Sequence, residues 1–523
     1  MRSLIACATL FFAAAVHAQE LTPGAKFERT LESGAEHTYT AKLESGSAIL
    51  ATVDQEGVDV VIDVYAPDGK RVAQLDTPNG AQGPEPINLT VLQTGTYKFV
   101  VHALDKSSGK YVMSVDRIVP PVENATRLAK EMYRSDVLVK LWEASLTDAK
   151  AVEKFIADRD GKPLIEPIPD NTSQMHVTFF CLGDDDTVGV LQVGGADFTA
   201  GIPMHRVGKT NLFFNFQNVP TDARFNCAYF VDEVHHAGAA QVHEYVFHPS
   251  SLLEMPNAPP QSTIVAKDGV AKGELTQATI HSATLKEDRT VGVYVPAGYD
   301  GKKACNLLIV FDGITYGGGR KEQAEVPTPT ILDNLIAEKR IGPTVAVFVW
   351  NMGKRNRDLY GSAAFADFIA TEVVPWARAH YAIAPGSGSV VAAGSSAGGF
   401  SATYCAFRHS DAIGNVLSQS GAYWITKDWQ NVRPTYPRDT GIMIEEFKQS
   451  ARLPIRFYIE VGRYDLGAGM LGSNRELRDV LQVKGYDVDY HEFDGGHEYV
   501  AWRGSLAYGL ISLLGRGVAA HHQ

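Results

Sequence analysis

A serine between glycines, followed far along the chain by an aspartate and a histidine, has the residue types of a nucleophilic catalytic set. Residues 394–398 read Gly-Ser-Ser-Ala-Gly, which fits G-x-S-x-G with Ser396 as the nucleophile. Asp465 and His497 follow in the order acid, then base. In such a set the histidine removes the serine proton and the carboxylate orients the imidazole. The three residues predict acyl transfer through a covalent intermediate.

The neighbouring residues predict the elements that position this set. Residues 390–393 form an apolar run suited to a buried strand, and small residues from Gly399 onward allow a helix. A strand, a tight glycine-flanked turn and a helix together leave the serine oxygen exposed. Glycine-serine clusters are also common in flexible turns, so the downstream acid and base carry much of the argument. Asp465 lies in the loop after a predicted strand, whereas Glu460 lies within that strand, so we expect Asp465 to be the acid.

Hydrophobic periodicity predicts three folded parts. Alternating strands and helices over residues 262–523 indicate an α/β fold with a largely parallel sheet. Together with the G-x-S-x-G turn and the order serine, acid, base, they predict an α/β-hydrolase catalytic domain. Two β-sandwich domains are predicted before it, at residues 20–118 and 173–260, from short alternating strands separated by turns. Residues 119–172 read as a helical linker that ends in prolines. Within the last domain, residues 363–380 are expected to form one helix.

Composition narrows the class of protein. The 523 residues carry a formal charge of −12, with 45% apolar and 21% charged residues. This acidity argues against nucleic acid as a partner, because phosphate contacts need clustered Lys and Arg. Residues 1–18 have the charged start, apolar core and small-residue cleavage site of a signal peptide, and no later run approaches the about 20 apolar residues of a membrane span. We expect an exported protein, periplasmic or secreted, with no membrane span.

Cysteine and histidine spacing does not indicate a metal site. The cysteines that remain after cleavage match no zinc pattern: Cys181, Cys227, Cys305 and Cys405. Cys181 and Cys227 fall in predicted strands of one domain, so a disulfide and two buried thiols are both open. Four histidines also lack a standard zinc spacing: His235, His236, His243 and His248. We expect neither a metal nor an organic cofactor.

Several motifs resemble the enterochelin (enterobactin) esterases of the esterase D superfamily. Residues 418–424 read S-Q-S-G-A-Y-W, residues 494–498 read D-G-G-H-E ahead of W-R-G, and residues 311–313 read F-D-G. The resemblance implies a serine esterase with Ser396 as nucleophile and His497 as base. It also implies an oxyanion hole formed by the backbone N–H groups of Ala397 and Ile314.

The remaining parts resemble other modules. Residues 173–260 resemble, more weakly, the N-terminal immunoglobulin-like domain of the same esterases, and residues 20–118 resemble the pre-peptidase C-terminal type domain of secreted bacterial enzymes. The chain departs from the esterase pattern at Glu498, which replaces an aspartate, and at Asp465, where those esterases often have glutamate. These departures leave the substrate open and keep the chemistry.

The sequence allows several functions. An exported carboxylic-ester hydrolase would act on a siderophore trilactone, a feruloylated or acetylated polysaccharide, or another aryl ester. The same fold could serve an acyltransferase, or a binding protein without catalysis, although the complete residue set argues against the latter. Trp424, Trp502 and Arg357 are candidates for binding a small-molecule or carbohydrate-linked ester, and the two aromatic residues would equally suit a buried core. The sequence does not indicate an oligomeric state.

Overall fold

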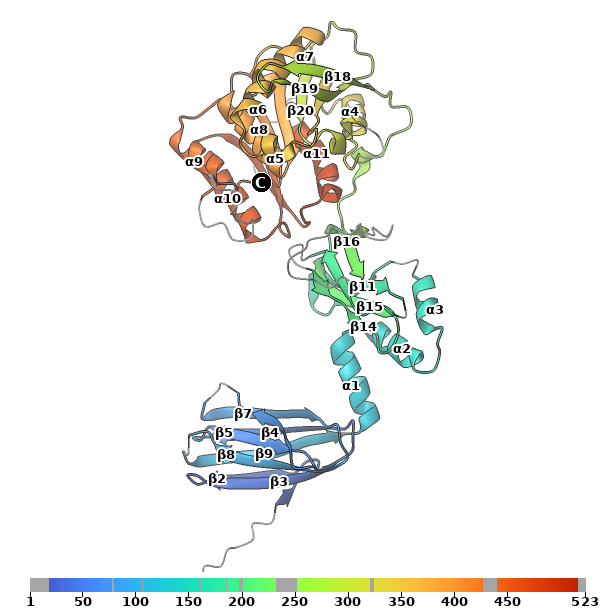
Figure 1. Ribbon diagram of the computed structural model, residues 1–523, viewed down its shortest axis with the longest axis vertical. Helices are drawn as coiled ribbons and strands as arrows, with labels where there is room; N and C mark the ends of the chain where they lie inside the picture. Colours follow the sequence, from blue (N-terminus) through green and yellow to red (C-terminus); the bar gives the residue numbers. More distant parts are fainter. Residues whose placement is uncertain are drawn as a thin grey trace, which may run out of the picture. The chain divides into compact units, whose positions relative to one another are not determined.

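The chain folds into two compact units, Met1–Phe155 and Ile156–Gln523 (Figure 1). The computed structural model describes residues 18–77, 80–105, 107–159, 162–184, 186–196, 201–231, 252–319, 324–426 and 440–515. Nearly all of the expected signal peptide lies outside these residues, as do the four histidines at 235, 236, 243 and 248.

The first unit contains a sandwich of two sheets, as the alternating sequence predicts. One sheet has the order β1-β3-β8-β5-β6 and the other β2-β9-β4-β7. Side chains alternate between buried and exposed along β3 and β8, and the buried faces of both sheets share one core around Tyr39 and Phe99. The strands are β1 (Gln19–Glu20), β2 (Lys26–Leu31), β3 (Glu36–Leu43), β4 (Ala48–Glu56), β5 (Val60–Tyr65), β6 (Arg71–Leu75), β7 (Gln82–Thr90), β8 (Gly95–Ala103) and β9 (Gly109–Val119).

Three helices follow, and the linker that the sequence predicts is shorter than expected. Helix α1 (Pro121–Tyr133) starts at a proline. Proline suits this position because the first N–H groups of a helix have no partner within it, so its missing N–H costs no hydrogen bond. Helix α2 (Asp136–Ser145) is capped by Ser135, and α3 (Ala151–Ala157) spans the boundary between the units. The proline-containing end of the predicted linker is instead strand β10 (Leu164–Ile168), which tolerates Pro167 because it is an edge strand.

A second sandwich opens the second unit, and we call it the β-domain (β10–β17). Its sheets have the orders β10-β11-β15-β14 and β13-β12-β16-β17. Phe179, Phe213 and Phe225 are buried in its core. Its other strands are β11 (Asn171–Leu182), β12 (Val190–Gly194), β13 (Ile202–Pro203), β14 (His205–Arg206), β15 (Leu212–Pro220), β16 (Arg224–Val231) and β17 (Leu252–Glu254).

The C-terminal domain is built on one sheet with the order β18-β19-β21-β20-β22-β23-β24-β25. The first three strands pair antiparallel and the remainder pair parallel, which confirms the predicted α/β fold. The strands are β18 (Glu274–Ser282), β19 (Glu287–Val295), β20 (Asn306–Val310), β21 (Thr344–Val349), β22 (Val390–Ser395), β23 (Asn415–Gln419), β24 (Arg456–Gly462) and β25 (Asp487–Phe493).

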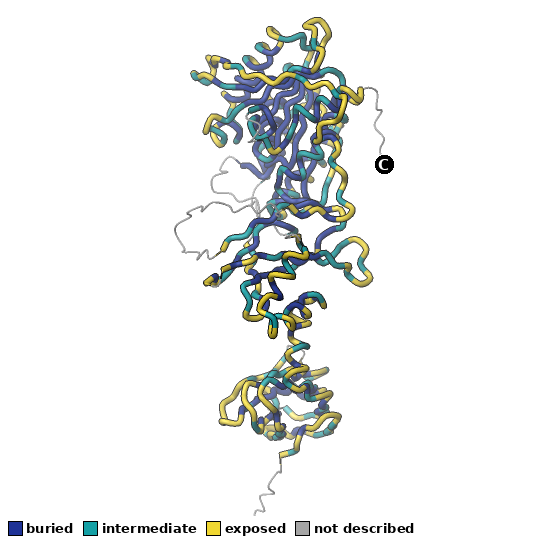
Figure 2. The backbone as a smooth tube through the Cα atoms, turned by 90° about the vertical axis from the view of Figure 1, so that its right-hand side faces the viewer, coloured by how far each residue is buried: buried dark blue, intermediate teal, exposed yellow. Residues whose placement is uncertain are grey.

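Helices cover both faces of this sheet, so its central strands are buried throughout (Figure 2). Leu307 and Ile309 point to one face and Leu308 and Val310 to the other. Helices α4 (Thr328–Ala337) and α11 (Tyr499–Leu514) pack on the second face. The first face receives α6 (Ala363–Phe368), α7 (Val374–His380), α8 (Ala397–Arg408), α9 (Ile442–Gln449) and α10 (Ala468–Val483).

The single helix expected over residues 363–380 is interrupted. A wide turn, Ile369–Val373, separates α6 from α7, and the N–H of Val374 donates to the carbonyl of Ile369. Pro375 explains the interruption, because its ring has no N–H and excludes a regular helical hydrogen bond one turn back.

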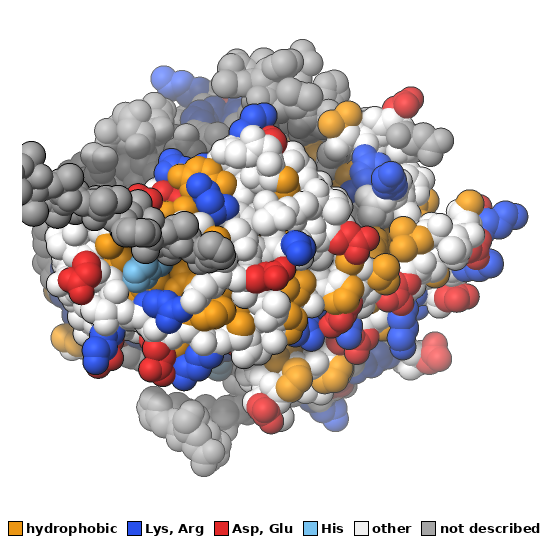
Figure 3. All heavy atoms as spheres, turned by 90° about the horizontal axis from the view of Figure 1, so that it is seen from below, with side chains coloured by type: hydrophobic (Ala, Val, Ile, Leu, Met, Phe, Trp, Pro, Cys, Tyr) orange, Lys and Arg blue, Asp and Glu red, His pale blue; other side chains and the backbone are white. Residues whose placement is uncertain are grey.

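The structure also bears on the cysteines, on membrane-spanning helices, on metal-binding clusters and on the distribution of surface charge. Cys181 and Cys227 are free and buried, so the structure shows thiols rather than a disulfide. Among the described helices, none is long and apolar enough to cross a membrane. The described residues likewise contain no cluster of three or more His, Cys, Asp or Glu suited to a metal ion. On the face drawn in Figure 3, acidic and basic side chains are interspersed rather than gathered by sign.

Candidate active site

Ser396 lies at a strained turn between β22 and α8, as the G-x-S-x-G pattern predicts. Its backbone has φ 56° and ψ −122°, a conformation that costs energy in any residue with a side chain. The turn is tight: a Cβ added at Gly394 would lie 2.8 Å from the carbonyl carbon of Gly398. Ser396 is partly exposed, while the residues on either side of it are buried. The elbow therefore presents its hydroxyl rather than packing it.

The two backbone N–H groups that the sequence suggested for an oxyanion hole both lie at the starts of helical turns. Ala397 is the first residue of α8, so its N–H has no acceptor within the helix. Ile314 opens a short turn, Ile314–Gly318, that follows β20. Gly313 allows this turn to press against β21, because a Cβ there would lie 2.6 Å from the carbonyl carbon of Phe348. A backbone N–H at the start of a helical turn is the kind of donor that stabilises a developing negative charge, so the oxyanion-hole role of these two groups stays a prediction.

Asp465 and His497 are paired in the structure. Nδ1 of His497 lies 2.6 Å from Oδ1 of Asp465, and the same oxygen accepts the N–H of Leu466 at 2.7 Å. The Asp465 side chain is fully buried and the His497 side chain is 14% exposed. This contact fixes the proton of the neutral imidazole on Nδ1, which leaves Nε2 to accept a proton. Asp465 therefore has the position of an orienting acid.

The carboxylate of Glu460, the alternative acid, belongs to a buried hydrogen-bond network. Its carboxylate accepts hydrogen bonds from Gln419 at 2.8 Å and from the hydroxyl of Tyr458 at 2.9 Å. Burial raises the pKa of Glu460. The amide nitrogen of Gln419 also donates to the carbonyl oxygen of Trp502 at 2.9 Å. Through Gln419, the S-Q-S-G segment at the end of β23 is thus hydrogen-bonded to both β24 and α11.

The aromatic candidates for substrate binding are largely packed away. Trp502 is 2% exposed, its indole N–H donates to Ser420 Oγ at 3.2 Å, and its ring lies edge-on to His497 with centroids 4.9 Å apart. It supports the histidine rather than offering a surface to a ligand. Trp424 is 9% exposed, and its indole nitrogen is buried without a hydrogen-bond partner among the described residues.

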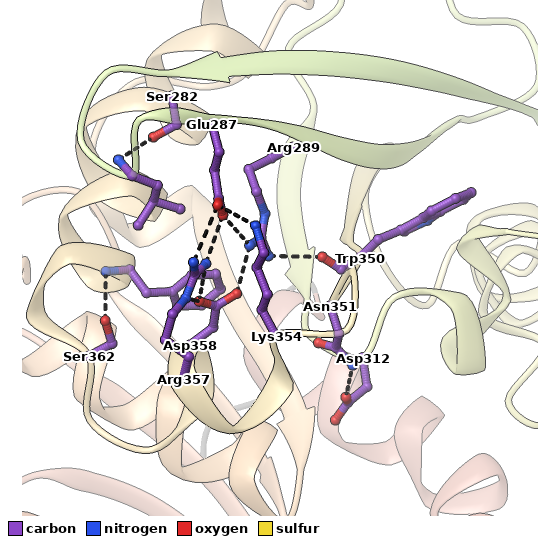
Figure 4. A network of polar contacts seen from close by, with 12 residues as sticks. Ser282, Glu287, Arg289, Asp312, Trp350, Asn351, Lys354, Arg357, Asp358 and Ser362 are labelled. Atoms are coloured by element: carbon purple, nitrogen blue, oxygen red, sulfur yellow. Dashed lines mark hydrogen bonds and ion pairs between the residues drawn. The ribbon is translucent and has the colours of Figure 1, made fainter.

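Arg357 forms ion pairs with two carboxylates (Figure 4). Its guanidinium lies 2.7 Å from both Glu287 and Asp358. Hydrogen bonds from Arg357 and Lys354 hold the pKa of Glu287 well below its usual range. Buried Arg289 pairs with Asp358 at 2.7 Å and joins the same network. The structure thus places Arg357 in an ion-pair network with its side chain 47% exposed, and its substrate-binding role stays a prediction.

The arginine that reaches the turn before Ile314 is Arg355, which sequence reasoning missed. It donates two hydrogen bonds to the Asp312 carboxylate, at 2.7 and 2.9 Å, and Asn351 donates a third. Asp312 is 3% exposed and has φ 52°. A Cβ added at Gly398 would lie 3.4 Å from its Oδ2, so this carboxylate lies against the first turn of α8. The sequence shows Arg355 only as an arginine shortly after a predicted strand, and it does not indicate which acidic residue the arginine pairs with.

We expect Arg355→Gln to lower kcat by up to about 10²-fold with little change in KM, the scale of losing one oxyanion donor. Without Arg355, the buried Asp312 charge would oppose the negative charge that develops beside Ala397. Steady-state kinetics check this, with Lys354→Gln as control, because Lys354 pairs with Glu287. The double variant Asp312→Asn/Arg355→Gln should recover part of the loss, and a double variant that is more impaired than Arg355→Gln would contradict the charge argument.

A cavity in the C-terminal domain is lined by residues other than the candidate catalytic set. About 660 Å³ in volume, it lies between β25 and α11 and is lined by residues that include Tyr458, His491 and Tyr508. None of Ser396, Asp465 and His497 lines it.

The C-terminal domain matches known esterases. Residues 282–513 match a protein-family model described as putative esterase. The chain is 29% identical over 279 residues to the iron(III) enterobactin esterase of Dickeya dadantii, covering 50% of this chain and 61% of the relative. It is 27% identical over 278 residues to the iron(III) enterobactin esterase of Escherichia coli K12, covering 51% and 63%. The chain thus spans about three fifths of the length of these curated relatives.

Solved structures show the same fold. The ferric enterobactin esterase of Salmonella typhimurium aligns with a TM-score of 0.57 at 21% identity, over 69% of this chain and 98% of that chain. The enterobactin esterase of Shigella flexneri, crystallised with enterobactin, aligns with a TM-score of 0.56 at 21% identity, over 69% and 97%.

Proposed function

The C-terminal domain is enterochelin esterase-like, and we propose that this protein hydrolyses carboxylic esters with Ser396 as nucleophile, His497 as base and Asp465 as orienting acid. The observation that carries the proposal is the 2.6 Å contact between His497 Nδ1 and Asp465 Oδ1, in a domain that presents Ser396 at a strained elbow. Chemistry of this kind needs these groups together.

The proposed reaction proceeds in two steps. Ser396 Oγ attacks the ester carbonyl while Nε2 of His497 takes its proton, and the N–H groups of Ala397 and Ile314 stabilise the oxyanion. The C–O bond breaks, the alcohol leaves with the proton from His497, and the acyl group stays on Ser396. Water then attacks the acyl-enzyme with His497 again as base, which releases the acid and restores the serine. No metal or organic cofactor is required by this sequence of steps.

We propose that the preferred ester is uncharged or weakly charged. Three arginines near the site motifs are paired with carboxylates: Arg355 with Asp312, Arg357 with Glu287, and Arg463 with Asp494 at 3.0 Å. Arg503, which the sequence also offers there, donates to Gln261 at 2.9 Å and forms no ion pair among the described residues. Lys427, a further cation that the sequence offers near these motifs, lies outside the described residues. A strongly anionic ligand would therefore meet few unpaired cations among the described residues, and the net charge of −12 would oppose its approach.

A siderophore trilactone is the second candidate, favoured by the relatives that act on iron(III) enterobactin. A panel of p-nitrophenyl acetate, methyl ferulate, acetylated xylan and enterobactin separates the possibilities. We expect a higher kcat/KM for methyl ferulate than for ferric enterobactin, on one preparation at two ionic strengths. A large preference for the ferric complex that weakens with salt would restore the siderophore substrate. Hydrolysis of none of the panel would contradict the esterase proposal.

Export is proposed from the first residues of the chain. Residues 1–18 have the pattern of a signal peptide, and Gln19, the first residue after the expected cleavage site, pairs with Tyr39 in the first sandwich. Expression in a bacterium followed by cell fractionation tests this, and we expect mature protein beginning at Gln19 outside the cytoplasm. Uncleaved protein in the cytoplasm would contradict it.

A further inference from the structure

One strand of the β-domain touches both loops that carry the candidate acid and base. Arg224 on β16 forms a parallel bridge with Gly495, two residues before His497. Phe225 packs edge-on against Tyr464, the residue before Asp465, with ring centroids 5.7 Å apart. Asn226 donates its backbone N–H to Oε2 of Glu498 at 2.6 Å. Three successive residues of β16 therefore contact the two loops.

Glu498 differs from the other residues of this contact because its carboxyl group is buried and only partly hydrogen-bonded. Its side chain is buried, with 6% of the residue exposed, and its Oε1 has no hydrogen-bond partner among the described residues. None of the ion pairs between described residues includes it. The titratable groups that face it are Cys227 on β16 and Asp465, with His497 adjacent in sequence. A charged carboxylate here would be buried with one hydrogen bond and a second negative charge nearby, which is unfavourable.

We propose that Glu498 is a positioning residue whose neutral carboxylic acid seats the His497 loop on β16, so that the β-domain fixes the geometry of the acid and base. The inference rests on the proposed esterase function. The protonated acid accepts the N–H of Asn226 on Oε2 and carries its proton on Oε1. In this form it adds no charge beside Asp465, whose Oδ2 is also buried without a partner among the described residues.

Loss of that proton would disturb the loop. Burial raises the pKa of Glu498 to about 8, and the nearby Asp465 acts in the same direction. Above this pH the new charge must be solvated, which opens the contact with β16 and loosens His497. Because a misplacement of about 1 Å can cost about 10²-fold in rate, the effect should appear in kcat rather than in KM.

The sign of the stability effect follows from the same proton. The pKa in the folded protein lies above its ordinary value of 4.5, so the folded state binds the proton more tightly than the unfolded state. The stabilisation from Glu498 is complete below about pH 4.5 and is lost as the pH rises to about 8. Glutamine mimics the neutral acid and cannot titrate, so Glu498→Gln should be free of this loss.

The test compares wild type, Glu498→Gln, Glu498→Ala and the control Glu254→Gln. Glu254 on β17 pairs with Arg224 on β16, so the control changes a carboxylate that contacts the same strand and leaves Glu498 intact. We measure kcat and KM for p-nitrophenyl acetate from about pH 6 to about pH 9, together with the free energy of unfolding over the same range. We expect Glu498→Gln to keep kcat within about threefold of wild type and to lose the alkaline decrease, while Glu498→Ala loses about 10- to 100-fold in kcat. Glu254→Gln should keep the wild-type pH profile.

Three outcomes would overturn the proposal: Glu498→Gln as impaired as Glu498→Ala, Glu498→Gln with the wild-type alkaline decrease, or Glu498→Ala equal to wild type. If wild type hydrolyses no ester, the esterase proposal fails instead. The unfolding measurement then still tests Glu498, because the difference in stability between Glu498→Gln and wild type should grow as the pH rises to about 8.

Discussion

Replacing Ser396 by alanine is expected to lower kcat by about 10⁶-fold and to leave the fold intact. Its backbone makes the contacts that hold the elbow: its N–H donates to Gln419 at 2.9 Å and its carbonyl accepts from Phe400 and Ala422 at 3.0 Å. Alanine keeps all of these and meets the same backbone strain as serine. Steady-state kinetics on an activated ester, with circular dichroism of the same preparation, measure both parts of the expectation.

The neighbouring Ser395 provides a matched control. It is fully buried at the end of β22, so Ser395→Ala should stay within about tenfold of wild type while Ser396→Ala does not. Retention of more than about a hundredth of wild-type turnover in folded Ser396→Ala would show that another residue is the nucleophile.

Asp465→Asn is expected to lower kcat by about 10⁴-fold. An asparagine amide can present its N–H₂ to Nδ1 of His497, which moves the imidazole proton to Nε2 and removes the base. Glu460→Gln is the comparison, because the buried Glu460 carboxylate accepts hydrogen bonds from Gln419 and Tyr458. Turnover of both variants on one ester decides between them.

Two results would reverse this assignment in different ways. Full activity of Asp465→Asn with an inactive Glu460→Gln would make Glu460 the acid. Full activity of both variants would mean that Ser396 and His497 work as a dyad.

The elbow and its partners could be predicted because their signals are local or ordered along the chain. Gly394 is required by a contact with a residue only four positions away, because a Cβ there would lie 2.8 Å from the carbonyl carbon of Gly398. Asp465 could be preferred to Glu460 because strand periodicity separates a loop residue from a strand residue. The apolar runs that become β20 to β24 are buried on both faces, which is the pattern of a parallel sheet.

Contacts between distant segments could not be predicted. Arg355 meets Asp312 across 43 positions, and Glu498 meets Asn226 across 272. The pairing of Arg357 with Glu287 could not be predicted either, because the two residues lie 70 positions apart. A tryptophan in the sequence can equally line a ligand site or pack against a histidine, and Trp502 packs against His497. Each of these depends on packing that periodicity does not encode.

Trapping with a fluorophosphonate tests whether Ser396 forms a covalent acyl-enzyme. The reagent forms a stable adduct with a serine only where a base activates it. We expect one adduct per chain by intact mass, located by peptide mapping on the segment that contains Ser396, and no adduct in Ser396→Ala. An adduct on another residue, or ester hydrolysis that continues undiminished in the presence of the reagent without labelling, would contradict it.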